Sequence, residues 1–124
     1  MRKILIVDDE EILRMLIADT LEDLDVQIDV AEDGKIALEK LGQSEYDLLL
    51  LDYMMPELTG MEVLERLPQA ARDRMPIIML TAKAQDSDRT KAMEAGVHRF
   101  IPKPFSPLEL LQVVEEMLEE QEGR

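Results

Sequence analysis

"LLLLDYMMPELTG", residues 48–60, joins four consecutive leucines to an aspartate and then to a loop that contains proline and glycine. A continuous apolar run of this length is typical of a strand that is covered on both faces, as central strands of parallel sheets are. Burying an ionised carboxylate without a partner costs free energy. Asp52 is therefore either a polar residue that ends the strand or a group placed there for a function.

Short apolar runs recur along the chain, with segments of helical periodicity between them. The predicted strands are residues 4–7, 26–31, 48–51, 77–80 and 97–101. Five such strands with intervening helices predict an α/β fold with a parallel sheet, right-handed crossovers and helices on both faces. Residues 26–31 alternate between apolar and polar, which favours an edge strand.

Several residues mark predicted helix ends. Thr59 and Ser106 each precede a glutamate by three positions, the pattern of a capping box at a helix start. Gly42 and Gly96 are expected at helix C-termini, where glycine adopts the left-handed conformation. Met93, like most methionines, is expected to fill the core.

Composition limits the classes of function. The 124 residues suit a single domain, which we assign to residues 1–122 with a tail at 123–124. A formal net charge of -14 argues against binding to nucleic acid or to anionic membranes. The absence of cysteine excludes disulfides and thiolate metal sites. No signal peptide or transmembrane segment is recognisable, so a cytoplasmic location is expected.

Polar side chains follow four of the five predicted strands. Asp8 and Asp9 follow the first, Asp52 the third, Thr81 the fourth and Lys103 the fifth. In an open parallel sheet, ligands bind outside the carboxyl ends of the strands. If the first and third strands are neighbours, the three carboxylates converge there and suit Mg²⁺, which prefers oxygen ligands.

The same cluster could stabilise a phosphoryl group. A lysine, a hydroxyl and a metal ion around one carboxylate would neutralise phosphoryl charge. The carboxylate of Asp52 could then act as a nucleophile and form an aspartyl phosphate. Taken singly, a residue of this kind after a strand is more often a turn residue or a helix cap.

Four motifs occur together: "ILIVDDE" at residues 4–10, "LLLLDYMMPELTG" at 48–60, "PIIMLTAK" at 76–83 and "RFIPKPF" at 99–105. In this order and spacing, the chain resembles receiver domains of response regulators, the phosphorylated halves of two-component systems, over essentially its whole length. The resemblance, to receiver domains like those of chemotaxis regulators, implies a doubly wound, flavodoxin-like fold with strand order 2-1-3-4-5 and five helices on two faces.

The resemblance also implies roles for the acidic residues. Asp52 matches the phosphoacceptor of the family. Asp9 and Asp52 match direct ligands of Mg²⁺, Asp8 matches a residue that acts largely through water, and the backbone carbonyl of Met54 matches a third protein ligand.

Further roles follow from the same match. Thr81 matches the hydroxyl that hydrogen-bonds the phosphoryl group, and Lys103 matches the lysine that pairs with it. Pro104 follows a peptide bond that is usually cis in the family. Phe100 matches an aromatic switch that rotates inward and remodels the face of the fourth helix, fifth strand and fifth helix, although a plain core role stays open.

Some positions depart from the family pattern, and others match positions that modulate the chemistry of the site in the family. Phe100 lacks the hydroxyl of the commoner tyrosine. His98 and Arg99 stand where a DNA-binding subfamily often has acidic dimer contacts, so a monomer or a weak phosphorylation-dependent dimer is expected. His98 is interpreted as a surface residue. Met54 and Lys83 flank the site at positions that tune dephosphorylation in the family.

The leading hypothesis is a phosphorylation-activated signalling switch that catalyses only its own phosphorylation and dephosphorylation. The expected partners are a sensor histidine kinase or phosphotransfer protein and a downstream protein target.

The chain could also be a receiver domain cut from a longer transcriptional or enzymatic regulator. A hydrolase of the haloacid-dehalogenase type is a third possibility, although its Asp-x-Asp pattern is replaced here by the adjacent pair Asp8 and Asp9. A scaffold that keeps only the fold is the fourth.

Overall fold

Five parallel strands form the centre of the structure, a computed structural model that describes the backbone of residues 1–82 and 86–122 and the side chains of residues 1–82 and 89–120. The strands are β1 (Arg2–Val7), β2 (Val26–Ala31), β3 (Leu48–Asp52), β4 (Ile77–Thr81) and β5 (Arg99–Pro102). Their order in the sheet is β2-β1-β3-β4-β5. The predicted order is therefore confirmed, and β2 is an edge strand as its alternating pattern indicated.

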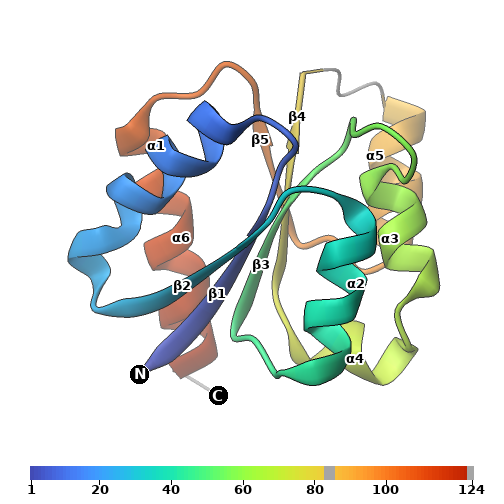
Figure 1. Cartoon of the computed structure of the whole chain (residues 1–124), viewed down its shortest axis with the longest axis horizontal. Helices are drawn as coiled ribbons and strands as arrows, with labels where there is room; N and C mark the ends of the chain where they lie inside the picture. Colours follow the sequence, from blue (N-terminus) through green and yellow to red (C-terminus); the bar gives the residue numbers. More distant parts are fainter. Residues whose placement is uncertain (83–85, 123–124) are drawn as a thin grey trace.

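Helices cover both faces of the sheet. They are α1 (Glu11–Leu21), the 3-10 helix η1 (Glu22–Leu24), α2 (Gly34–Gln43), α3 (Gly60–Arg66), α4 (Gln69–Arg74), α5 (Asp86–Glu94) and α6 (Pro107–Glu122). Figure 1 shows α1 and α6 together on one face, at the left, and α2, α3 and α5 on the other face. This arrangement is the doubly wound architecture that the sequence predicts.

Each face of the sheet has its own apolar core. Core A, under α1 and α6, comprises the buried residues Ile4, Ile6, Ile17, Leu21, Leu48, Leu50, Ile78, Leu80, Ile101, Leu110, Val114, Met117 and Leu118. Core B, under α2, α3 and α5, comprises Leu5, Val7, Ala31, Ala37, Tyr46, Leu49, Leu51, Met55, Val63, Leu64, Leu67, Met75, Ile77, Met79, Ala92 and Val97. Successive side chains of a strand point to opposite faces, so the four leucines of β3 divide equally between the two cores. This division explains why the run is continuously apolar.

The prediction of five helices is incomplete, because the described residues contain six α-helices and one 3-10 helix. The additional helix is α4, which lies between α3 and β4 and has no buried residue. Without a buried face it shows no apolar stripe that a periodicity argument could detect. The predicted fourth and fifth helices therefore correspond to α5 and α6.

Strand β5 begins at Arg99, two positions later than predicted. Val97 instead belongs to the turn that ends α5, because its N–H donates to the carbonyl of Ala92 at 3.0 Å. Gly96, directly before Val97, has φ at 114°, and its N–H donates to the carbonyl of Met93 at 3.1 Å. These two bonds form a Schellman motif, so the predicted C-cap at Gly96 is confirmed.

Other predicted helix ends have mixed outcomes. The capping box at Thr59 is confirmed, and Ser106 accepts the predicted hydrogen bond from the N–H of Glu109 at 3.1 Å. The prediction for Gly42 is wrong, because α2 continues to Gln43. Met93 is also not in the core, since 60% of its surface is exposed. Lys83 and the predicted tail at 123–124 lie outside the described residues.

Candidate functional site

Asp8 and Asp9 directly follow β1, at the carboxyl end of the sheet. Asp8 is completely buried, and its Oδ1 accepts a hydrogen bond from the N–H of Glu10 at 2.9 Å. The carbonyl of Asp8 accepts a second bond, from Nη1 of Arg14 on α1 at 2.7 Å. These contacts fix the turn between β1 and α1 and leave Asp9 exposed to solvent.

Asp52 is the last residue of β3 and is 3% exposed. The loop after it folds back closely, because the N–H of Gly60 donates to the carbonyl of Tyr53 at 2.8 Å. A Cβ atom at Gly60 would lie 2.6 Å from the carbonyl oxygen of Asp52. Only glycine permits this approach, so Gly60 holds the start of α3 against the end of β3.

Lys103 joins the two strand ends through its ammonium group. Its Nζ lies 3.0 Å from Oδ1 of Asp52 and 3.1 Å from Oδ2 of Asp8. All three side chains lie two positions after a strand residue of core A, and the alternation of a strand therefore points them toward the same side. The sequence predicts this convergence, and the structure gives its distances.

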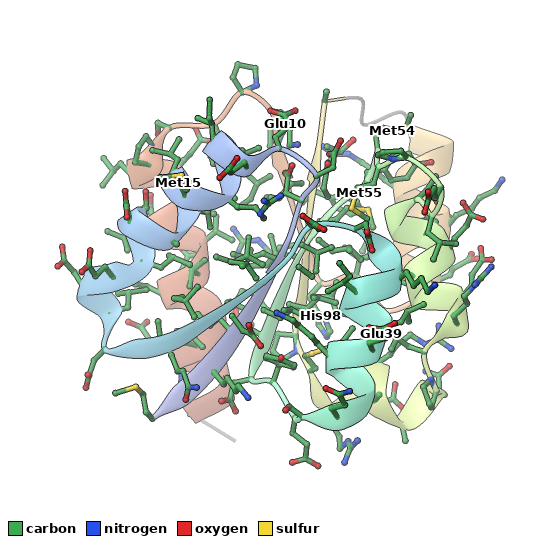
Figure 2. The ribbon with its side chains drawn as sticks, viewed as in Figure 1. Glu10, Met15, Glu39, Met54, Met55 and His98 are labelled. Carbon is green, nitrogen blue, oxygen red and sulfur yellow. The ribbon has the colours of Figure 1, made fainter. Side chains whose placement is uncertain are left out.

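The three carboxylates form a cluster that fits a divalent cation. One oxygen each from Asp8, Asp9 and Asp52 can be chosen so that all lie within 4.8 Å of one another. Oxygen donors alone, without sulfur or imidazole, suit a hard cation such as Mg²⁺. Met54 follows Asp52 by two residues, and Figure 2 shows it at the same end of the sheet as Glu10.

The electrostatic environment shifts two pKa values. Burial raises the pKa of Asp52 to about 6, and the negative charges of Asp8 and Asp9 contribute, while Lys103 opposes them. Burial by itself would lower the pKa of Lys103, but its hydrogen bonds and charge interactions with Asp52 and Asp8 more than compensate and raise it. Lys103 therefore stays protonated and keeps a positive charge between the two carboxylates.

Thr81 ends β4 on the other side of Asp52. It is 3% exposed, and its carbonyl accepts a hydrogen bond from the N–H of Lys103 at 2.8 Å. The peptide bond between Lys103 and Pro104 is cis. The site is thus formed at the ends of four strands, β1, β3, β4 and β5, which are consecutive neighbours in the sheet.

Phe100 lies outside this cluster, on β5. It is opposite Met79 in the ladder between β4 and β5, and its half-buried ring packs against core B. Thr81 lies two positions after Met79 and therefore points to the same face as Phe100. The guanidinium of Arg89 on α5 covers the ring, with Cζ 5.2 Å from its centroid.

Two residues of the site were not identified from the sequence. Arg14 could have been suspected, because it lies one turn after Glu10 on the helix that leaves the acidic pair. Gly60 was recognised only as the residue after a helix cap. Its close approach to Asp52 depends on the path of the loop, for which the sequence carries no signal.

Comparison with known proteins identifies the family that this chain resembles. A family model described as the response regulator receiver domain matches residues 4–115. The transcriptional regulatory protein ResD of Bacillus subtilis is 44% identical over 116 residues, which cover 94% of this chain and 48% of ResD. The transcriptional regulatory protein CpxR of Escherichia coli is 42% identical over 118 residues, which cover 95% of this chain and 50% of CpxR. The chain therefore spans about half the length of these curated relatives.

Solved structures agree. The chemotaxis protein CheY4 of Vibrio cholerae has a TM-score of 0.87 at 30% identity, with 94% of this chain and 98% of that chain covered. A CheY-like receiver domain protein from Methanospirillum hungatei has a TM-score of 0.89 at 30% identity, with coverage of 99% and 98%. At these levels of similarity the fold is shared.

Proposed function

Because the chain belongs to the family of response regulator receiver domains, we propose that Asp52 is the residue of this signalling switch that accepts a phosphoryl group, in a reaction that depends on Mg²⁺. The observation that carries the proposal is the position of Lys103, whose Nζ bridges Asp52 and Asp8. The positive charge of its ammonium group lies beside the carboxylate that would become phosphorylated. The cluster of Asp8, Asp9 and Asp52 supports a metal site next to it.

The chemistry is a transfer between two carriers. An ionised oxygen of Asp52 attacks the phosphorus of a phosphohistidine on a sensor kinase or phosphotransfer protein. The bond between phosphorus and the imidazole nitrogen breaks, and an acyl phosphate forms on Asp52. The imidazole leaves with the electron pair and takes up a proton. Attack of water on phosphorus later returns inorganic phosphate and the free carboxylate.

The protein's own groups serve this transfer in separate ways. Lys103 would follow the negative charge from the carboxylate to the phosphoryl oxygens. Thr81 would donate its hydroxyl hydrogen to the phosphoryl group. Asp9, Asp52 and the carbonyl of Met54 would hold Mg²⁺ directly, with Asp8 acting through water. The bound ion would supply positive charge against the phosphoryl oxygens.

Signalling would follow from the new charge on Asp52. Thr81 and Lys103 would move toward the phosphoryl group, and the ring of Phe100 would move into space behind Thr81. The surface formed by α5, β5 and α6 would change as a result. This switch has no separate substrate to turn over, so its catalysis is limited to its own phosphorylation and dephosphorylation.

The proposed partners of the domain are proteins. A net charge of -14 would repel the phosphates of a nucleic acid, so any DNA binding would need a part of a longer protein. A monomer or a weak phosphorylation-dependent dimer stays a prediction, as does the cytoplasmic location. None of the described helices is long and apolar enough to cross a membrane.

The proposal is tested by incubating the protein with acetyl phosphate and Mg²⁺ and measuring its intact mass. Wild type should gain one phosphoryl group, and Asp52→Asn should gain none. Asp23→Asn, which alters an exposed aspartate of η1, should behave like wild type. No gain in wild type, or an equal gain in Asp52→Asn, would refute the assignment of Asp52.

A second assay separates this switch from a hydrolase. With a phosphate ester in large excess, a haloacid-dehalogenase-type enzyme would release many molecules of phosphate per protein molecule. The proposed switch should release none from an ester and only slow, stoichiometric phosphate from its own aspartyl phosphate. Continuous release that Asp52→Asn abolishes would favour the hydrolase.

A further inference from the structure

The C-terminal end of helix α5 is anchored to the rest of the molecule by a buried side chain and by hydrogen bonds. Among its described side chains, Ala92 is fully buried, whereas Met93 is 60% exposed. The end of the helix is held by the turn at Gly96 and by Nη1 of Arg72, which donates to the carbonyl of Ala95 at 2.9 Å. The sequence of α5 has no apolar stripe, so contacts of its described polar side chains contribute to its attachment.

One such contact joins α5 to β5. The guanidinium of Arg89 lies over the ring of Phe100, with Cζ 5.2 Å from the ring centroid, which is within the range of a cation–π interaction. This ring contact is the interaction that the described structure records for Arg89. Phe100 has no hydroxyl that could bond to α5 instead, so the contact depends on the face of the ring.

The opposite face of β5 carries a comparable arginine with a different partner. Nη1 of Arg99 lies 2.9 Å from Oε2 of Glu116 on α6. The short edge strand β5 is therefore flanked by one arginine contact on each face. Arg99 offers a matched control for Arg89, because it has the same charge and lies next to Phe100 on β5, but its recorded partner is Glu116 on α6 and not the ring.

The register of the sheet relates the ring of Phe100 to Thr81. Phe100 pairs with Met79, and Thr81 lies further along β4 on the same face. Movement of the ring toward Thr81 would shift it relative to the guanidinium of Arg89, because Arg89 belongs to α5 and not to β5. Leaving the observed position of the ring would therefore disturb the cation–π contact.

We infer that Arg89 is a positioning residue that holds the ring of Phe100 over α5 and so opposes its inward movement. This inference rests on the proposed function, in which that movement accompanies phosphorylation of Asp52. Arg89 does not touch the reacting groups and acts only through Phe100. Its removal should favour the phosphorylated conformation.

Fluorine NMR tests the contact itself. The chain contains two phenylalanines, Phe100 and Phe105, so incorporation of 4-fluorophenylalanine gives two resonances, which Phe105→Leu assigns. Arg89→Gln should shift the resonance of Phe100 and leave that of Phe105 in place. Arg99→Gln should leave both resonances in place.

Phosphorylation kinetics test the consequence. With acetyl phosphate at fixed Mg²⁺, Arg89→Gln should be phosphorylated about two- to fivefold faster than wild type, as expected for the loss of one exposed cation–π contact. Arg99→Gln, which removes the same charge, should react at the wild-type rate. In a Phe100→Leu background, Arg89→Gln should have no further effect, because the two residues act as a pair.

The outcomes separate the two proposals. If wild type is not phosphorylated, the proposed function fails, and the fluorine spectrum still tests the contact between Arg89 and Phe100. If wild type is phosphorylated but Arg89→Gln has the wild-type rate, the inference is overturned. An unshifted Phe100 resonance in Arg89→Gln, or an equal acceleration in the Phe100→Leu background, overturns it as well.

Discussion

At the scale of single residues, Asp52 should lower the stability of the metal-free protein. Its pKa is raised to about 6 by burial and by neighbouring carboxylates, so the folded state binds a proton there more tightly than the unfolded state does. The stability that this proton provides is present below about pH 4 and is lost as the pH rises through about 6. Asp52→Asn has no proton to lose. It should therefore raise the free energy of unfolding near neutral pH by about 1–3 kcal/mol, and by little at acid pH.

The measurement is urea denaturation in the presence of a chelator, at neutral pH and near pH 4. Glu39→Gln is the control, since it neutralises an exposed carboxylate on α2, away from the site in Figure 2. A lower stability of Asp52→Asn at neutral pH would contradict the prediction. It would show that the ion pair with Lys103 outweighs burial and repulsion.

Two glycines should respond oppositely to the same substitution. A Cβ at Gly60 would lie 2.6 Å from the carbonyl oxygen of Asp52 and 3.1 Å from Cα of Tyr53. Gly60→Ala should therefore cost about 1–3 kcal/mol and slow phosphorylation, because the end of β3 must shift. At Gly42, inside α2, a Cβ meets nothing within 4 Å. Gly42→Ala should gain about 0.5–1 kcal/mol from helix propensity.

Thermal and urea denaturation of both variants, with the acetyl phosphate assay, check this pair. Equal effects of the two substitutions would contradict the account of Gly60. The pair also shows which role of a glycine the sequence does not reveal. Gly42 was expected at a helix end and Gly60 carried no special expectation, because the need for glycine at residue 60 arises from a contact with a strand end.

At the scale of elements, helix α2 is tied to edge strand β2 by a polar network. Nζ of Lys40 lies 2.9 Å from Oδ1 of Asp29, and the hydroxyl of Tyr46 donates to Oδ2 at 2.6 Å. Burial would raise the pKa of Asp29, but the hydrogen bonds from Tyr46 and Lys40 outweigh it and lower that pKa. The network therefore favours the ionised form of Asp29.

Tyr46→Phe should destabilise the protein in a manner that depends on pH. A lowered carboxyl pKa contributes stability above the ordinary value of about 4, and this contribution is lost as the pH falls through the lower value in the folded state. The loss in Tyr46→Phe should be about 0.5–1.5 kcal/mol near neutral pH and should shrink under acid conditions. Urea denaturation across this pH range measures it.

A control comes from the exposed ion pair between Arg74 and Glu45, whose side chains are 66% and 87% exposed. Arg74→Gln should change stability by less than about 0.5 kcal/mol at any pH. A loss in Tyr46→Phe that is constant with pH would argue that packing of the ring, and not its bond to Asp29, is what matters.

Elements with a buried face were predictable and elements without one were not. Strand β3 is predictable from its continuously apolar run, because both of its faces are covered and all five of its residues are buried. Helix α4 buries no residue, so its position depends on tertiary contacts such as the bond from Arg72 to Ala95. The start of β5 was misplaced for a related reason, since Val97 is apolar but is used by the end of α5.

At the scale of the whole molecule, the topology assembles a site from residues that lie far apart in the chain. Asp8 and Lys103 are separated by 95 positions, yet they form an ion pair at 3.1 Å. The order β2-β1-β3-β4-β5 places their strands on either side of β3 and β4. Convergence at the strand ends was predictable from the sequence. The burial of Asp8 and the contact of Arg14 with its carbonyl depend on side-chain packing and were not.

The acidic site and the net charge of -14 together predict that Mg²⁺ stabilises the fold. A ligand that binds only the folded state raises the free energy of unfolding, and the increase grows with the logarithm of the ligand concentration once that concentration exceeds the dissociation constant. The increase is about 2.7 kcal/mol when the concentration is 100 times the dissociation constant. Thermal denaturation should show the melting temperature rising with Mg²⁺ in this way. A chelator should reverse the rise.

General screening of repulsion must be separated from specific binding, because any salt relieves self-repulsion in so acidic a protein. Asp9→Asn removes an exposed carboxylate of the cluster and should abolish the part of the Mg²⁺ effect that exceeds NaCl at equal ionic strength. Asp23→Asn removes an exposed carboxylate elsewhere and should retain it. If the two variants lose equal amounts, then the stabilisation comes from net charge alone, and the three strand-end aspartates do not form a specific site for the ion.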